Sequence, residues 1–150
     1  MDTIQLELRR IRMDNESWDV AAVHINGEEL VSRLSAFESP FAKREGHPSI
    51  AGAYSYLPKQ CLEARMHAHD DELDDDDRVA VLECDCCGVP GCWPLKVRIT
   101  TDDDTVTWSD FRQPHRSEES AAALWDYQGF GPFVFDRNQY EGAVKDILAR

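Results

Sequence analysis

The chain has 150 residues, which indicates a single domain over residues 1–150, and its apolar fraction of 42% is typical of a folded globular protein. Its 29 acidic and 16 basic residues give a formal net charge of −13. A surface with this charge repels phosphate backbones, so no nucleic acid is expected as a partner.

The first part of the chain predicts a β-hairpin followed by a helix. Residues 4–8 alternate between apolar and polar, as in a half-buried strand, and residues 18–25 form the returning strand. In the first strand the apolar positions are even-numbered up to Leu8 and odd-numbered from Ile11 on. This shift by one residue predicts a β-bulge near residues 9–10. The helix that follows is expected to end at Ser39, because Pro40 lacks the N–H that a helix interior needs.

The middle of the chain predicts two loops, a short helix and a buried strand. Residues 44–58 read as an ordered loop, and residues 59–66 as a short helix. Residues 67–77 include seven acidic side chains, which repel one another and predict a solvated loop. Residues 78–84 are apolar on both faces, as expected of a central strand.

The last third predicts a hairpin, a short helix, a strand and a terminal helix. The hairpin covers 95–101 and 105–111, with its turn at Asp103. A short helix is expected over 117–125, and a last strand over 131–135.

The terminal helix is the most regular element of the sequence. Asp136 and Gln139 have the spacing of a capping box, and apolar residues recur at helical spacing over 140–148. The order of all these elements predicts an α+β fold with a mainly antiparallel sheet of about five strands and two or three helices on one side.

The compartment is inferred from the absence of targeting segments. The N-terminus has no apolar stretch like that of a secretory signal, and no apolar run approaches the roughly 20 residues that span a bilayer. We expect a cytoplasmic protein that does not enter membranes. Thiols stay reduced there, so clustered cysteines indicate metal binding or catalysis more than disulfides.

The stretch LECDCCGVPGCWPL, residues 82–95, gathers four of the five cysteines. Cys84 and Cys87 have the spacing of zinc ligands before a glycine, Cys86 could replace either, and Cys92 adds a third thiolate. The hairpin register about Asp103 places Cys92 opposite Pro114 or His115. This imidazole would complete a zinc site with three cysteines.

Two other interpretations of the cysteines stay open. Buried thiols pack as small apolar groups and need no further function. Reactive redox thiols are a third interpretation, but Glu83 and Asp85 flank the cluster and disfavour the thiolate that such chemistry requires.

The segment WSDFRQPHR, residues 108–116, contains most of the candidate binding residues. These are Trp108, Asp110, Arg112 and Arg116, and Trp93 of the cysteine loop is the fifth. Asp110 and His115 could form an acid–base pair, or an ion pair that pins the end of the hairpin. Five aromatic residues could line a pocket or belong to the core, and these are Trp93, Trp108, Trp125, Phe130 and Phe133.

Three segments resemble a family of small uncharacterised bacterial proteins. They are CDCCGVPGCWPLKVRI, TVTWSDFRQPHR and FGPFVFDRNQYE, and the resemblance is clearest over residues 80–145. Relative to the family's C-x-C-G loop, Cys87 is an additional cysteine. The resemblance therefore implies Cys84, Cys86 and Cys92 as the better set of thiolate ligands. It also marks the cysteine loop and the QPHR segment, which contains His115, as the candidate site, and it implies no activity.

The leading hypothesis is a non-enzymatic binding or interaction module whose cysteine loop, closed by zinc or by packing, presents the WSDFRQPHR edge to a protein or a small ligand. The first alternative is a thiol-based redox enzyme that uses Cys84, Cys86 and Cys92. The second is an acidic inhibitor or immunity-type protein that binds a basic partner through residues 70–77.

Overall fold

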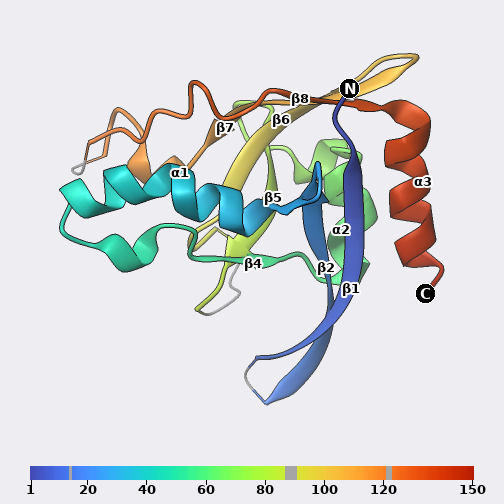
Figure 1. The fold of residues 1–150 in the computed structure, drawn as a ribbon, viewed down its shortest axis with the longest axis horizontal. Coiled ribbons are helices and arrows are strands. Elements are labelled where there is room, and N and C mark those ends of the chain that lie inside the picture. The colour runs from blue at the N-terminus through green and yellow to red at the C-terminus, as the bar shows by residue number, and fades with distance from the viewer. Residues whose placement is uncertain (14, 87–90, 121–122) are drawn as a thin grey trace.

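Two antiparallel sheets share one hydrophobic core in the computed structural model, which describes residues 1–13, 15–86, 91–120 and 123–150 (Figure 1). The smaller sheet has the order β1-β2-β3, with β1 (Ile4–Met13), β2 (Glu16–Ile25) and β3 (Glu28–Glu29). The larger sheet has the order β4-β5-β6-β7-β8, with β4 (Tyr54–Tyr56), β5 (Val79–Cys84), β6 (Leu95–Thr101), β7 (Thr105–Arg112) and β8 (Phe133–Asp136).

The helices are α1 (Leu30–Arg44), α2 (Lys59–Met66) and α3 (Arg137–Leu148), with 3-10 turns η1 (Pro48–Ile50), η2 (Asp70–Glu72) and η3 (Pro114–Arg116). In Figure 1, α1 and α3 lie at opposite ends of the molecule. The α+β fold predicted from the sequence is confirmed. No helix of the described residues has both the length and the apolar character that crossing a membrane requires.

The hairpin of β1 and β2 pairs in an unbroken register, from Ile4 opposite Ile25 to Met13 opposite Glu16. The bulge predicted near residues 9–10 is therefore wrong. Figure 1 shows the hairpin tip projecting beyond the helices, and no residue of 9–12 is fully buried. The slip in apolar phase thus moves Ile11 to the other face without exposing a core residue, and no bulge is needed to correct it.

Helix α1 passes through Pro40 and ends at Arg44, so the end predicted at Ser39 is wrong. An interior proline costs about 3 kcal/mol through its missing N–H and its ring. The residues after it offset this cost by packing, since Ala42 is fully buried and Phe41 stacks on Trp125 with ring centroids 6.1 Å apart.

Strand β4 lies within the segment predicted as a loop over 44–58. Only three residues long, it is the edge strand that pairs with β5, and it buries Tyr54 and Tyr56 against the core. The predicted helix at 59–66 coincides with α2. The helix predicted over 117–125 is wrong for the described part of that range, which holds turns and extended chain.

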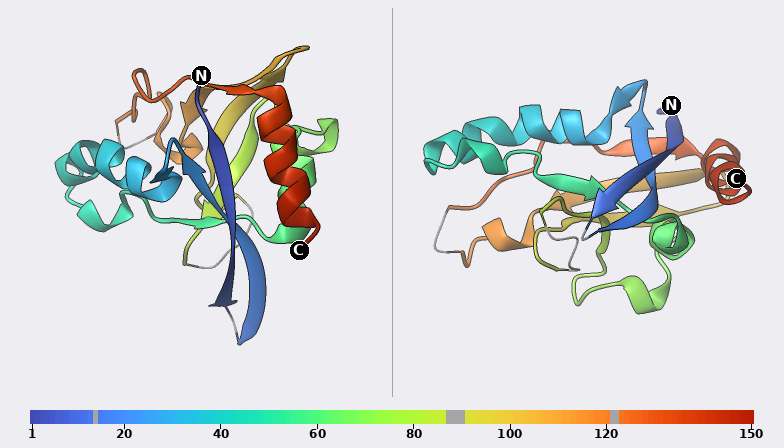
Figure 2. Two further views of the ribbon diagram at one scale, coloured as in Figure 1. Left: turned by 45° about the vertical axis from the view of Figure 1, so that its right-hand side comes forward. Right: turned by 90° about the horizontal axis from the view of Figure 1, so that it is seen from below.

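Helix α3 forms half of the predicted capping box. The Asp136 carboxylate accepts the Gln139 N–H at 2.9 Å. The Gln139 amide turns instead to β1, where it accepts from the Ile4 N–H at 3.1 Å and donates to the Ile4 carbonyl. This amide joins α3 to the edge of β1, and both views in Figure 2 are consistent with that arrangement.

Candidate functional site

Strand β7 changes character halfway along its length. Its first half, from Thr105 to Trp108, pairs with β6 on one side and with β8 on the other. The β8 pairing ends where Trp108 lies opposite Phe133, so Ser109–Arg112 extend past the neighbouring strand. The register with β6 also shifts within this second half, where Asp110 has a φ of 54°.

The chain that precedes β8 is drawn away from β7 by two carboxylates of the α1 region. Residues 124–128 alternate between exposed and buried, as in an extended chain, with Trp125 and Tyr127 inward. The Trp125 indole N–H donates to Glu45 at 3.0 Å, and the Tyr127 hydroxyl donates to Glu38. These bonds hold the segment against α1 and open a space beside β7.

Glu38 is fully buried and is the centre of a polar network. Its carboxylate accepts the Tyr54 hydroxyl at 2.6 Å, the Gly52 N–H at 2.9 Å and the Tyr127 hydroxyl. The buried amide of Gln113 donates to the Tyr54 oxygen at 3.2 Å. Burial raises the pKa of Glu38 above its usual 4.5, and the hydrogen bonds oppose this rise. The network fixes the wall of the site.

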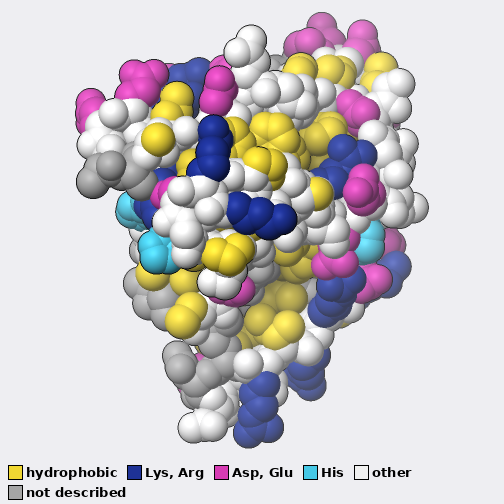
Figure 3. Space-filling model, turned by 60° about the vertical axis from the view of Figure 1, so that its left-hand side comes forward, with side chains coloured by type: hydrophobic (Ala, Val, Ile, Leu, Met, Phe, Trp, Pro, Cys, Tyr) yellow, Lys and Arg dark blue, Asp and Glu magenta, His cyan; other side chains and the backbone are white. Residues whose placement is uncertain are grey.

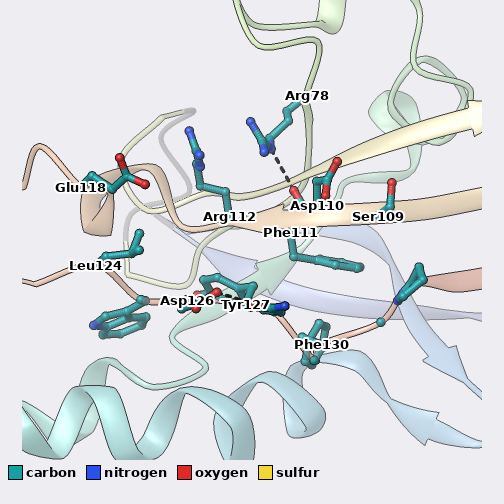
Figure 4. A pocket seen from close by; sticks show the side chains of 15 residues that line it. Arg78, Ser109, Asp110, Phe111, Arg112, Glu118, Leu124, Asp126, Tyr127 and Phe130 are labelled. Atoms are coloured by element: carbon teal, nitrogen blue, oxygen red, sulfur yellow. Dashed lines mark hydrogen bonds between the residues drawn. The ribbon is translucent and has the colours of Figure 1, made fainter.

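The resulting groove has a volume of about 530 Å³. In Figure 4, Arg78 and Arg112 lie on one side of β7, and Phe111, Tyr127 and Phe130 lie on the other. The lining residues come from two stretches and two single residues, which are Ser109–Arg112, Leu124–Pro132, Glu118 and Arg78. Figure 3 shows the α1 end of the molecule, where hydrophobic side chains lie open among basic and acidic ones.

The acidic run, predicted to be a solvated loop, is partly tethered to the sheet beside this groove. Asp74 accepts the backbone N–H groups of Asp76 and Arg78 at 2.8 and 3.0 Å, and its carboxylate lies 3.3 Å from the Lys96 ammonium. Asp76 lies 3.3 Å from the Arg112 guanidinium. Sequence alone could not show this, because the basic partners lie on strands distant in the chain.

The cysteine loop closes one end of β5. Cys84 is buried, and its sulfur accepts from the backbone N–H of Cys86 at 3.4 Å. The side chains of Cys86 and Cys92 are exposed. Cys87 lies outside the described residues. The hypothesis that Cys84 and Cys87 are a CxxC pair of zinc ligands therefore stays a prediction. Among residues 1–13, 15–86, 91–120 and 123–150, no three His, Cys, Asp or Glu side chains are grouped to hold a metal ion. Zinc stays a prediction from the sequence.

His115 lies beside the cysteine loop, as the hairpin register predicted. Its Nε2 is 2.9 Å from the Gly91 carbonyl oxygen, and its ring stacks on Trp93 with centroids 5.9 Å apart. The Arg116 guanidinium lies 5.0 Å from the Trp93 ring and donates to Glu45 at 2.6 Å. Trp93 and Arg116 therefore clamp the loop to the end of α1.

Two of the proposed roles in WSDFRQPHR are corrected by these contacts. Asp110 pairs with Arg98 at 2.8 Å and His115 contacts Gly91, so the Asp110–His115 pair is not formed. Trp108 is fully buried and its indole N–H donates to the Tyr140 hydroxyl at 3.1 Å, which makes it a core residue. Of the five candidate binding residues, Asp110 and Arg112 line the groove.

Sequence reasoning missed Glu38, Gln113 and Arg78. Of the 124–132 wall it named only Trp125 and Phe130, as aromatic residues that could line a pocket, and both do line the groove. The sequence could have indicated that Glu38 is buried. It stands four residues after Leu34 on the apolar face of the helix, where a charge is unexpected. Arg78 stands directly before the buried strand β5, and a buried position there is also unusual for a charge.

Comparisons with protein-family models, with curated proteins and with solved structures find no match to this chain. The family resemblance of the three sequence segments stays a prediction.

Proposed function

We propose that this protein is a non-enzymatic binding module and that the groove beside Ser109–Arg112 is its binding site. The observation that carries the proposal is the mismatch between β7 and β8, since β7 continues past the last pair while the 124–132 segment turns to α1. Free strand edges are usually covered or paired, and here the edge faces a walled space.

The size and lining of the groove favour a small ligand over a protein partner. Its volume of about 530 Å³ falls within the range of pockets that hold small molecules. Phe111 and Phe130 meet edge to face with centroids 5.0 Å apart, and together they provide an apolar surface beside polar groups. Apolar surface with a few directed polar groups is the usual character of a ligand site.

The walls are held by buried hydrogen bonds, which favours a groove formed before the ligand binds. Tyr127 is fixed by Glu38, and Gly131 approaches Phe111 so closely that an added Cβ would lie 3.1 Å from its ring. Gly131 also has a φ of 72°, which favours glycine. A preformed site loses less conformational entropy on binding.

The test is amide chemical-shift mapping with a library of aromatic fragments on isotope-labelled protein. We expect the shifts to concentrate at 109–112 and 124–132 and to vanish in Gln128→Trp, which places a large ring at an exposed lining position. Glu63→Trp, at an exposed position on α2, is the matched control. Shifts spread over the surface, or unchanged in Gln128→Trp, would contradict the proposal.

A further inference from the structure

Arg78 is a buried charge at the wall of the groove. Its side chain is 7% exposed. Its Nε donates to the Asp110 carbonyl oxygen at 2.8 Å, and its Nη1 lies 3.5 Å from Asp76. A guanidinium has five N–H donors, and among the described residues these are the polar partners of the Arg78 side chain. No Arg78 nitrogen is among the buried atoms that lack a partner in the described part of the chain, so its other N–H groups reach solvent and can take a further acceptor. Desolvation of the charge itself still carries a cost.

Two further arginines increase that cost. Burial lowers the pKa of Arg78, and the positive charges of Arg112 and Arg98 lower it further. The carboxylates that compensate the three arginines are Asp76 and Asp110, which are 58% and 55% exposed. Three positive charges therefore face two solvated negative ones, within a chain whose formal net charge is −13.

The backbone at Asp110 holds Arg78 in place. Asp110 has a φ of 54° in the second half of β7, in the left-handed region that is uncommon within strands although Asp adopts it more readily than most residues. This turn accompanies the bulge in β7, and the Asp110 carbonyl accepts from Arg78. Residues in such conformations cluster at ligand sites.

We infer that the groove binds a small molecule that carries a carboxylate or a phosphate group on an aromatic body. The inference rests on the proposed function and names its ligand. Arg78 and Arg112 receive the anionic group, because planar guanidinium groups match the oxygens of carboxylate and phosphate. Phe111 and Phe130 contact the aromatic body.

The acidic residues of the groove set the orientation of this ligand. Three acidic residues line the groove. Asp110 is paired with Arg98 at 2.8 Å, whereas neither Glu118 nor Asp126 forms an ion pair among the described residues. They would attract a cation and repel an anion placed near them. The anionic group must therefore lie at the arginine end, and an amine on the ligand, if present, must lie toward Glu118 and Asp126.

The experiment titrates four probes into the full chain at low ionic strength, with binding followed by amide chemical shifts. The probes are benzoate, phenyl phosphate, benzyl alcohol and benzylammonium. We expect benzoate or phenyl phosphate to bind at least about tenfold more tightly than benzyl alcohol, because hydrogen bonds to charged groups exceed neutral ones by about that factor. The stronger of the two anions identifies a carboxylate or a phosphate ligand.

Three variants test the named residues. Arg78→Met and Arg112→Met are expected to weaken binding of the preferred anion about tenfold or more. Arg98→Met removes the same charge from an arginine that does not line the groove, so we expect less than about a twofold effect. Asp76→Asn removes the carboxylate that competes for both groove arginines and should tighten binding about threefold.

The outcomes separate the two proposals. Tighter binding of benzylammonium, or equal losses in Arg78→Met and Arg98→Met, would overturn the anionic ligand. Groove shifts with benzyl alcohol and no preference for anions would refute the anionic ligand and leave the binding groove intact. No groove shift with any of the four probes would refute both. Circular dichroism of each variant shows that a loss of binding is not a loss of fold.

Discussion

The two halves of β7, a strand of eight residues, differ in how they are paired with their neighbours. In the first half, Val106 and Trp108 are buried between two partner strands, and the alternation of the sequence gives their orientation. In the second half, the register shifts at Asp110 and the β8 side is open. The first half belongs to the core, and the second half forms the wall of a groove.

The difference arises outside the strand itself. Glu38 and Glu45 bind the side chains of Tyr127 and Trp125, and so hold the chain before β8 against α1. Without those bonds, the 124–132 segment could continue the sheet along Ser109–Arg112. Two acidic side chains, Glu38 on α1 and Glu45 at its C-cap, thus determine how far a strand in another part of the fold is paired.

The largest expected effect of a substitution is in the paired half. Trp108→Ala should lower the free energy of unfolding by about 3–5 kcal/mol, because the indole is fully buried and holds the Tyr140 hydroxyl. Chemical denaturation measures the change. Ser109→Ala, one residue further along, should change stability by less than about 0.5 kcal/mol. Similar losses at both positions would mean that the two halves do not differ.

Removing the anchor of the groove wall should have the next largest effect. Glu38→Leu leaves Gly52, Tyr54 and Tyr127 without their common acceptor, and unsatisfied buried donors cost about 1–3 kcal/mol. Denaturation measures the loss, and Glu63→Leu on the exposed face of α2 is the control. An unchanged stability of Glu38→Leu would show that the network does not hold the wall.

The same carboxylate should give the protein a distinctive dependence on pH. The pKa of Glu38 is raised by burial, so above pH 4.5 the folded state still holds a proton that the unfolded state has lost. Its contribution to stability is therefore present at low pH and falls as the pH rises through the folded pKa, by at most about 1.4 kcal/mol per pH unit. Unfolding of the wild type and of Glu38→Gln, measured across this range, isolates the contribution. A difference between them that is independent of pH would contradict it.

The smallest expected effect concerns the acidic run beside the open half. Asp74→Ala should cost about 1 kcal/mol, because this carboxylate accepts two backbone N–H groups and faces Lys96. Asp75→Ala, at an exposed neighbouring position, should be near neutral. Thermal melting of the two variants gives the comparison. Equal melting temperatures of the two variants would show that the Asp74 contacts do not stabilise the fold and that the acidic run is a solvated loop.

Local patterns in the sequence were sufficient for much of the fold. The β6–β7 hairpin was predicted because its alternation and its acidic turn agree, and Ile99 does lie opposite Trp108. The terminal helix was predicted from its apolar spacing, and Tyr140, Val144 and Ile147 are its buried face. The error at Pro40 arose because packing after the proline outweighs a local rule.

The groove was harder to foresee, since its parts meet only through the tertiary structure. Asp110 and Arg112 were named as candidates from their motif, and they do line it. Of the opposite wall, only Trp125 and Phe130 were named, as aromatic residues that could line a pocket. The rest was missed because residues 124–132 show no regular element, and their position depends on side-chain bonds to the α1 region. A buried glutamate in an apolar helix face was the available signal, and it marks the anchor of that wall.

The most direct measurement compares two tyrosines introduced on the same strand. Ser109→Tyr places a ring in the groove, and Thr107→Tyr places one on the same face of β7 in the paired half. The affinity for the tightest aromatic anion, phenyl phosphate or benzoate, is measured by chemical-shift titration in the wild type and in both variants. We expect Ser109→Tyr to abolish binding and Thr107→Tyr to retain the wild-type affinity within about twofold. Binding that survives Ser109→Tyr, or that is lost equally in both variants, would contradict a binding site at the open half of β7.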